Sequence, residues 1–459
     1  MSHSNNPCSR PHIALIPSSG MGHLTPFLRL AVSLTPHDVQ ITLITAHPTV
    51  SLAESDSLVQ FSRAFPQVMH KHMLIPSISN NSNAKTYEDP FTVQYEAIRR
   101  SSHILSPLLS SLLPPVSAVI TDMSLTSMVV PITKTLNLPN YILFTTCAKM
   151  LAIYAYYHKI AHNMETMKDD IPIPGLPPIP KKWLPPLLLS NSNNLLKTHF
   201  IENGENFVAA NGVLVNTFEE LEKETLAALN SGLIVGQLPP VISIGPLIPS
   251  ALETGEELAW LNDQPCSSVL YICFGTRAAI SRDQMREIGI GMVKSEYKFL
   301  WVVKGKQVDR EDEDELQDIV GHSIFSELKQ RGLLVNKWIK QEQILSHRAI
   351  GGFISHCGWN SVTEAVWYSI PILAWPQNAD QKINADLVRK NMVGKWDESW
   401  GWGGRELVDG TEIAQKVEEM MEDKLLRGTA EKMRNKARLA VGLEGSSHKG
   451  LTKLIHSLS

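Results

Sequence analysis

The sequence lacks the features that mark several classes of protein. Its cysteines are few and spread out, with no CxxC pair, which is typical neither of a disulfide framework nor of a structural zinc site. No run of 18 apolar residues occurs, and the first apolar stretch, at 13–17, is too short for a secretory signal. We therefore expect a cytoplasmic protein without a membrane span. The cysteines are Cys8, Cys147, Cys266, Cys273 and Cys357.

Neither sign of charge dominates the sequence. The 42 lysines and arginines against 46 aspartates and glutamates give a formal net charge of −4. This balance predicts no surface for nucleic acid or for an anionic membrane. Hydrophobic residues make up 43% of the chain and charged residues 19%, as in globular proteins, and 459 residues are too many for one ordinary core. We expect a monomer of two or three domains.

Short aliphatic strands recur along the chain, each followed by a Gly, Ser or Pro break and a helical stretch. Near-continuous β-branched runs separated by helices indicate parallel sheets covered on both faces. The pattern predicts two doubly wound α/β domains that face a central cleft, with ligands beyond the carboxyl ends of the strands. The expected strands are 12–17, 39–46, 116–122 and 141–146 in the first half, and 267–275, 297–304, 332–338, 349–355 and 370–376 in the second.

The domain boundaries follow from composition. The proline-punctuated stretch 237–250 suits a connection between domains. We therefore predict a first domain at 1–240, a linker at 241–256, a second domain at 257–438, and a C-terminal helix at 439–459 that packs back on the first domain.

The densest motif is WIKQEQILSHRAIGGFISHCGWNSVTEAVWYSIPILAWPQNADQ, the 44 residues 338–381. A helix is expected to begin near Trp359 or Asn360, directly after a buried strand. Its free N–H groups suit a diphosphate, with His356, Asn360 and Ser361 as side-chain donors. The alternative for Ser361 to Glu364 is a capping box that needs no ligand.

The two ends of this motif carry further candidates. Trp338 either stacks on a base or belongs to the core, and Gln341 can bond to a ribose or a base. Asp380 and Gln381 either grip vicinal sugar hydroxyls or begin a helix with Asp380 as its N-cap. Their joint order within one βαβ unit favours a nucleotide-sugar site.

A second candidate site lies at the turn Ser18–His23. Its two glycines resemble a dinucleotide fingerprint, but Thr25 replaces the third glycine and the second strand ends without an acid, which disfavours NAD. A lone histidine is more often structural than catalytic. However, Asp122 ends another parallel strand, where its carboxylate could orient the His23 imidazole as in a catalytic triad. The absence of a GxSxG elbow disfavours a hydrolase.

Residues 338–381 resemble the signature box of plant UDP-sugar glycosyltransferases that modify secondary metabolites. The resemblance implies a GT-B-like fold of two Rossmann-like domains, the first binding the acceptor and the second the UDP-sugar. It implies that His23 is the general base, backed by Asp122. It further places Trp338 on uracil, Gln341 and Glu364 on the ribose, His356, Asn360 and Ser361 on the diphosphate, and Trp359, Asp380 and Gln381 on the sugar, with Gly22, Thr145, Gly275, Thr276, Ile339 and Gly358 as further donor contacts. The glutamine at 381 is associated with glucose.

Proton affinities favour a phenolic acceptor. The pKa of an imidazole, about 6.5, lies about 3.5 units below that of a phenol near 10, so proton transfer from the phenol costs roughly 5 kcal/mol. Proton transfer from a water-like hydroxyl would cost roughly 12 kcal/mol. The expected reaction is an inverting in-line displacement of UDP from UDP-glucose, making the chain a hexosyltransferase. We expect no bound cofactor and no metal, because no DxD or metal-ligand cluster accompanies the box.

Other segments narrow the resemblance. PSSGMGHLTPFLRLA, the Asp89–Phe91 triplet and the 398–403 segment are similar to plant flavonoid C-glucosyltransferases. This implies transfer to a ring carbon of a flavonoid, 2-hydroxyflavanone or dihydrochalcone-like acceptor. O-glucosylation of a phenol is the alternative. A non-catalytic nucleotide-sugar-binding protein and a retaining phosphorylase-like enzyme are less favoured.

Overall fold

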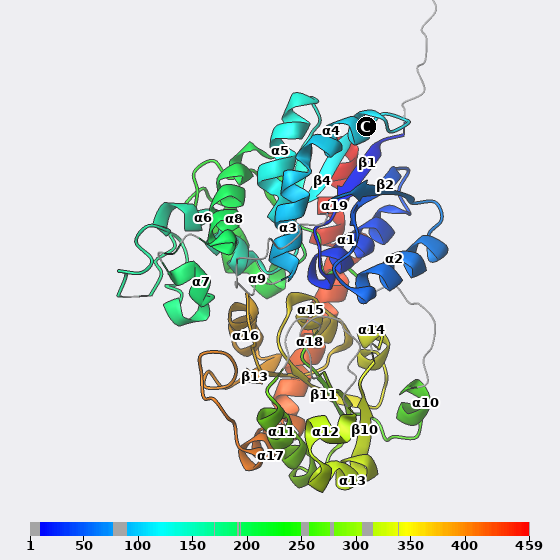
Figure 1. Cartoon of the computed structure of the whole chain (residues 1–459), viewed down its shortest axis with the longest axis vertical. Coiled ribbons are helices and arrows are strands. Elements are labelled where there is room, and N and C mark those ends of the chain that lie inside the picture. Colours follow the sequence, from blue (N-terminus) through cyan, green and yellow to red (C-terminus); the bar gives the residue numbers. More distant parts are fainter. Residues whose placement is uncertain are drawn as a thin grey trace, which may run out of the picture. The chain divides into compact units, whose positions relative to one another are not determined.

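The computed structural model describes residues 10–76, 90–168, 170–190, 192, 194–248, 257–275, 280–304, 315–337 and 339–458 (Figure 1). These residues divide into two compact units. The first takes the described parts of Met1–Lys181, Pro186–Leu247 and Ala440–Ser459, and the second those of Lys182–Pro185 and Ile248–Leu439.

The first unit is built on a seven-stranded parallel sheet with the order β3-β2-β1-β4-β5-β6-β7. Strand β1 pairs with both β2 and β4, so the order reverses there, which is where such sheets bind ligands. The strands are β1 (His12–Ile16), β2 (Gln40–His47), β3 (Met69–Leu74), β4 (Ala118–Asp122), β5 (Asn140–Phe144), β6 (Gly212–Val215) and β7 (Val241–Ser243).

Helices cover both faces of this sheet, because side chains alternate along buried strands. Leu15 packs with Phe27 of α1 and Phe61 of α2, whereas its neighbours Ala14 and Ile16 pack with residues of α3, α4 and α5. The helices are α1 (Met21–Leu34), α2 (Leu52–Ala64), α3 (Pro90–Arg100), α4 (Ser102–Ser110), α5 (Thr126–Thr135), α6 (Ala148–Ile160), α7 (Pro186–Leu189), α8 (Leu195–Asn206), α9 (Glu219–Asn230) and α19 (Ser446–His456).

The edge strand β7 differs from the linker expected at 241–256. Val241 pairs with Val213 of β6, so this stretch belongs to the first sheet rather than to a connection. A proline-flanked extended segment has the same sequence pattern whether it is a linker or an edge strand. Helix α19 contacts β7, and Ser447 Oγ donates a hydrogen bond to the Gly245 carbonyl at 2.6 Å. Residues 249–256 of the expected linker lie outside the described residues.

The second unit contains a six-stranded parallel sheet with the order β10-β9-β8-β11-β12-β13. Its core includes the buried indoles of Trp301, Trp375 and Trp400. The strands are β8 (Val269–Cys273), β9 (Lys298–Val302), β10 (Gly332–Val335), β11 (Ile350–Ser355), β12 (Ile372–Ala374) and β13 (Gly394–Trp396). The helices are α10 (Glu257–Asn262), α11 (Arg282–Lys294), α12 (Leu316–Val320), α13 (His322–Arg331), α14 (Gln341–Leu345), α15 (Trp359–Tyr368), α16 (Gln381–Lys390), α17 (Gly410–Met421) and α18 (Lys424–Val441).

Strands occur in all nine expected segments, which confirms the prediction of two parallel α/β sheets. The sequence analysis missed β3, β6, β7 and β13. Strand β3, with the sequence MHKHML, has three consecutive polar residues at the sheet edge instead of an aliphatic run, and the other three strands have only three or four residues. Among the described helices, none is both long and apolar enough to cross a membrane.

Candidate active site

His23 lies in the first turn of α1, directly beyond the carboxyl end of β1. The turn requires glycine at position 20, where φ is +97° and an added Cβ would lie 3.2 Å from the Phe91 ring. The Gly20 carbonyl accepts a hydrogen bond from the His23 amide at 2.9 Å. At Gly22, which the sequence analysis counted as a donor contact, an added Cβ would meet no atom within 4 Å.

Asp122 holds the His23 ring from the neighbouring strand. His23 Nδ1 lies 2.9 Å from Asp122 Oδ2 and 3.1 Å from Oδ1, and the carboxylate is completely buried while the imidazole is 17% exposed. Ser124 donates to Oδ1 through its amide, at 2.9 Å, and through its hydroxyl. With Nδ1–H donating to the carboxylate, His23 Nε2 carries the lone pair that can accept a proton.

Thr145 joins this group from the end of β5. Its Oγ1 lies 3.5 Å from His23 Nδ1, and the residue is 5% exposed. Because β1, β4 and β5 are adjacent in the sheet, their carboxyl ends bring His23, Asp122 and Thr145 together.

Two residues that the sequence analysis missed support the His23 turn. Glu54 Oε1 accepts from the Gly20 amide at 2.6 Å, and Glu54 also closes a capping box with Ser51 at the start of α2. The Tyr95 hydroxyl donates to the Ser19 carbonyl at 3.2 Å, and its ring meets the His23 ring edge-on. The Ser-x-x-Glu spacing signals Glu54 locally. No local signal identifies Tyr95, which is 76 residues from Ser19 in the chain.

In the second unit, α15 begins at Trp359, as expected, with Gly358 as its N-cap. The capping-box interpretation of Ser361 and Glu364 is wrong, because Ser361 is already the third residue of the helix. Glycine at the N-cap provides no side chain to bind the first amides, and no side-chain cap is formed. A helix N-terminus that carries no side-chain cap suits an anion beyond it, because the helix dipole is positive there.

Gln341 connects Ser361 and Glu364. Its Nε2 donates to Glu364 Oε2 at 2.7 Å and to Ser361 Oγ at 3.0 Å. The structure thus brings together three of the residues that the sequence analysis assigned to ribose and diphosphate, although Gln341 is 20 residues before Ser361.

His356 lies where the turns after β8 and β11 meet. A Cβ on Gly275 would lie 2.7 Å from His356 Nε2, and one on Gly358 2.5 Å from the same atom, so both glycines allow the ring to approach. Burial lowers the pKa of His356 to about 4, which keeps the ring neutral. Its Nδ1 and the Oδ1 of Asn360 are buried and have no hydrogen-bond partner among the described residues. Such atoms are rare in native proteins and are typical of a site that binds a polar ligand.

Asp380 and Gln381 follow β12. Helix α16 begins at Gln381 with Asp380 at its N-cap position, as the alternative expected, but the Asp380 side chain makes no capping hydrogen bond. Instead Asp380 Oδ2 accepts from Asn384 Nδ2 at 2.9 Å. Asn384 also donates to the Cys357 carbonyl at 2.9 Å, which ties the start of α16 to the turn before α15. Gln381 Oε1 accepts from the amides of residues 377 and 378.

Of the remaining candidates in this region, two lie among the described residues and two do not. Ile339 and Trp359 are buried, at 6% and 3% exposure. Thr276 and Trp338 lie outside the described residues.

The chain is similar to known glycosyltransferases in sequence and in structure. The family described as UDP-glucoronosyl and UDP-glucosyl transferase matches residues 247–425. UDP-glycosyltransferase 708G2 of Citrus unshiu is 48% identical over 99% of this chain and 98% of its own. UDP-glycosyltransferase CGT of Oryza sativa subsp. japonica is 41% identical over 97% of this chain and 95% of its own. The crystal structure of LpCGTa in complex with UDP is similar at a TM-score of 0.86 and 39% identity, covering 98% of this chain and 100% of that one.

The family match falls mainly on the second unit, whereas both curated relatives extend over nearly the whole chain, including the residues around His23. The two parallel sheets are those of the GT-B fold. The chain therefore belongs to the plant UDP-glycosyltransferase family.

Proposed function

We propose that this UDP-glycosyltransferase moves glucose from UDP-glucose to a ring carbon of a phenolic acceptor of the flavonoid or dihydrochalcone type, with inversion at the anomeric carbon. The observation that carries the proposal is the His23–Asp122 pair, in which a buried carboxylate lies 2.9 Å from the imidazole Nδ1. A carboxylate in this position fixes the tautomer and stabilises the imidazolium that forms when Nε2 takes a proton.

The second unit supplies the donor site in this proposal. Its support is the group of glycine-lined turns around His356, the unpartnered polar atoms of His356 and Asn360, and the Gln341–Ser361–Glu364 cluster. We assign the diphosphate to His356, Asn360, Ser361 and the N-terminus of α15, where N–H groups offset the charge that develops on departing UDP. Gln341 and Glu364 are assigned to the ribose, and Trp359, Asp380 and Gln381 to the sugar.

The proposed reaction begins at a hydroxyl of the acceptor. His23 Nε2 takes the proton of an acceptor phenol, and the phenolate shares its charge with the ortho and para ring carbons. One of these carbons attacks the anomeric carbon as the bond to the UDP oxygen breaks, so UDP leaves with the electron pair. The attacked ring carbon then loses its own proton to solvent, and the electron pair of that C–H bond makes the ring aromatic again as a phenolate. The phenolate oxygen takes back the proton from His23 Nε2, so the base is neutral for the next turnover.

The same base would serve O-glucosylation, in which the phenolate oxygen attacks instead. We favour carbon because the sequence resembles C-glucosyltransferases over most of its length. No side chain of the His23 pair distinguishes the two outcomes, since both begin from the same phenolate.

The product decides between them. The protein is incubated with UDP-glucose and a phloroglucinol-type ketone, and the hexose adduct is heated in acid before mass spectrometry. We expect one added hexose that survives the acid. Loss of the hexose would show an O-glucoside, and no adduct with any phenol would contradict the proposed function altogether. A parallel reaction with UDP-galactose tests the assignment of Gln381, for which we expect slower transfer.

A further inference from the structure

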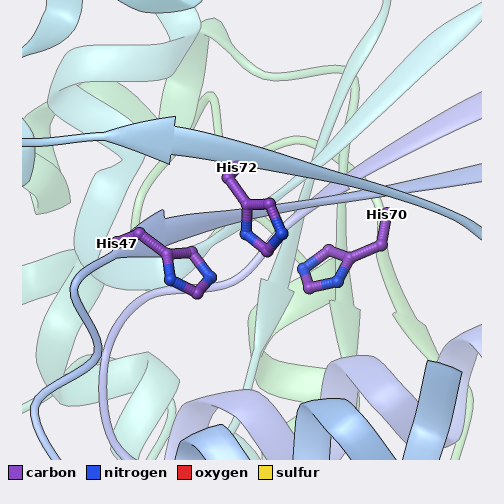
Figure 2. Close-up of side chains that lie close together, drawn as sticks. All are labelled: His47, His70 and His72. Carbon is purple, nitrogen blue, oxygen red and sulfur yellow. The ribbon is translucent and has the colours of Figure 1, made fainter.

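Three histidines gather at the outer edge of the first sheet. His47 ends β2, and His70 and His72 lie on the edge strand β3 (Figure 2). The parallel register pairs Thr45 with His72 and Leu43 with His70. Because paired residues point to the same side and side chains alternate along a strand, all three histidines lie on one face of the sheet.

The rings are close enough to share one ligand. One ring nitrogen from each histidine lies within 4.8 Å of the other two. The ring centroids of His47 and His72 are 3.9 Å apart, and those of His70 and His72 are 4.4 Å apart. A metal bound at about 2.1 Å holds two nitrogens roughly 3.4–4.2 Å apart. Side-chain shifts of about 1 Å would therefore complete the geometry.

The hydrogen bonds around the cluster leave nitrogen lone pairs available. His47 Nε2 is buried and has no hydrogen-bond partner within the described part of the chain. His70 Nε2 lies 2.7 Å from Thr45 Oγ1, and the tautomer in which this nitrogen donates leaves the Nδ1 lone pair for a ligand. A second partner that orients a histidine in this way is typical of metal sites.

We propose that His47, His70 and His72 form a binding site for a divalent transition-metal ion of the zinc class. Three imidazole nitrogens suit Zn²⁺, Ni²⁺, Co²⁺ or Cu²⁺, whereas Mg²⁺ and Ca²⁺ prefer oxygen ligands. His72 is exposed, so water completes the coordination sphere. The site is separate from the proposed transfer reaction, for which the sequence analysis expects no metal, and neither His23 nor Asp122 belongs to it.

A metal at this site would join β3 to β2. His47 comes from the carboxyl end of β2 and the other two ligands from within the edge strand β3, so one ion would link both strands. A metal ion that binds only the folded state stabilises that state. The melting temperature should therefore rise as the concentration of the ion increases above its dissociation constant.

Cobalt titration tests the site directly. The full chain, without a polyhistidine tag, is titrated with Co²⁺ while visible absorption is recorded, and Zn²⁺ and Mg²⁺ are added as competitors. The variants are His72→Gln and, as matched control, His162→Gln, which also removes an exposed histidine. We expect one equivalent of Co²⁺, displaced by Zn²⁺ but not by Mg²⁺. Affinity should fall more than about tenfold in His72→Gln and stay unchanged in His162→Gln.

Equal loss or equal retention of binding in the two variants would overturn the proposal, as would no Co²⁺ binding by the unaltered protein. Melting without metal checks that His72→Gln folds normally. If it does not, His47→Gln takes its place, and binding equal to that of the unaltered protein would contradict the site. Because the readout is metal binding, failure here leaves the proposed transfer reaction untouched, and the reverse also holds.

Discussion

We call the residues around His23 in the first unit and those around His356 in the second the two half-sites. They differ in whether their polar atoms have hydrogen-bond partners. In the first unit, Asp122 accepts from His23 and from Ser124, and Glu54 accepts from the Gly20 amide. In the second unit, His356 Nδ1 and Asn360 Oδ1 are buried without a partner among the described residues. His23 Nδ1 and Asp122 thus have their partners within the first unit, as a base that must hold one tautomer requires. In the second unit, His356 Nδ1 would gain an acceptor from a bound diphosphate, and Asn360 Oδ1 would gain a donor from a hydroxyl of a bound sugar.

This difference separates two kinds of mutational effect. Changes at the first half-site should alter the rate of transfer without altering the affinity for UDP. Changes at the second should alter the affinity for UDP first.

Replacing His23 with Ala should lower kcat by about 10³-fold, because a positioned general base contributes about 10²–10⁴. Steady-state kinetics with UDP-glucose measure the rate, and calorimetry measures the dissociation constant of UDP, which should stay within about twofold. His162→Ala is the matched control. An equal weakening of UDP binding by His23→Ala would break the division between the half-sites.

Replacing Asp122 with Asn should lower kcat by about 10²-fold, since the amide keeps the shape but no longer stabilises the imidazolium. The loss should be smaller than for His23→Ala because the base itself remains. The melting temperature reports whether the buried site tolerates the amide. If the rate is unaffected in a folded variant, Asp122 has no part in positioning the ring.

Replacing Gly275 with Ala should weaken UDP binding about tenfold, because the new Cβ would lie 2.7 Å from His356 Nε2 and force the ring to move. Titration calorimetry with UDP measures the effect. Gly428→Ala is the control, because no atom lies within 4 Å of a Cβ there. Unchanged UDP affinity in Gly275→Ala would show that the turns at Gly275 and Gly358 take no part in binding the donor.

Replacing Glu96 with Gln should lower stability by about 1 kcal/mol at neutral pH, a value discounted because Arg99 is partly and Arg100 largely exposed. Burial raises the pKa of Glu96, but hydrogen bonds from both arginines outweigh it and lower the pKa to about 2. This stabilisation is fully present above about 4.5, the unfolded value, and is lost as the pH falls through about 2.

Urea unfolding across this pH range measures the effect. The control is Glu431→Gln, whose exposed pair with Arg434 should contribute less than about 0.5 kcal/mol. Equal effects of the two substitutions would show that the buried position of Glu96 gives its ion pairs no added share in stability.

The sequence predicted the sheets better than the fine geometry of the sites. Aliphatic strands such as β1 and β8 carry a strong local signal, whereas β3 combines histidines with few apolar residues. The start of α15 decided the role of Ser361. A capping box needs Ser361 as the N-cap, but the N-cap is Gly358, three residues earlier, so Ser361 lies in the first helical turn. The Ser-x-x-Glu pattern is the same in both cases, so only coordinates distinguish them.

Long-range partners were beyond the sequence. Tyr95 reaches the Ser19 carbonyl, and Asn384 reaches the Cys357 carbonyl, through contacts set by packing rather than by spacing. His23 and Asp122 were predictable as a pair because each ends or follows a strand at the same edge of one parallel sheet.

The pH dependence of kcat in the His23→Ala variant is the sharpest test of whether His23 is the base. A base is unnecessary once the acceptor phenol is ionised in solution. The kcat of this variant should therefore rise about tenfold per pH unit up to the pKa of the acceptor and approach that of the unaltered protein, whose own rate levels off at lower pH. Parallel profiles for the two proteins, with a constant difference at every pH, would contradict the role of His23 as the base.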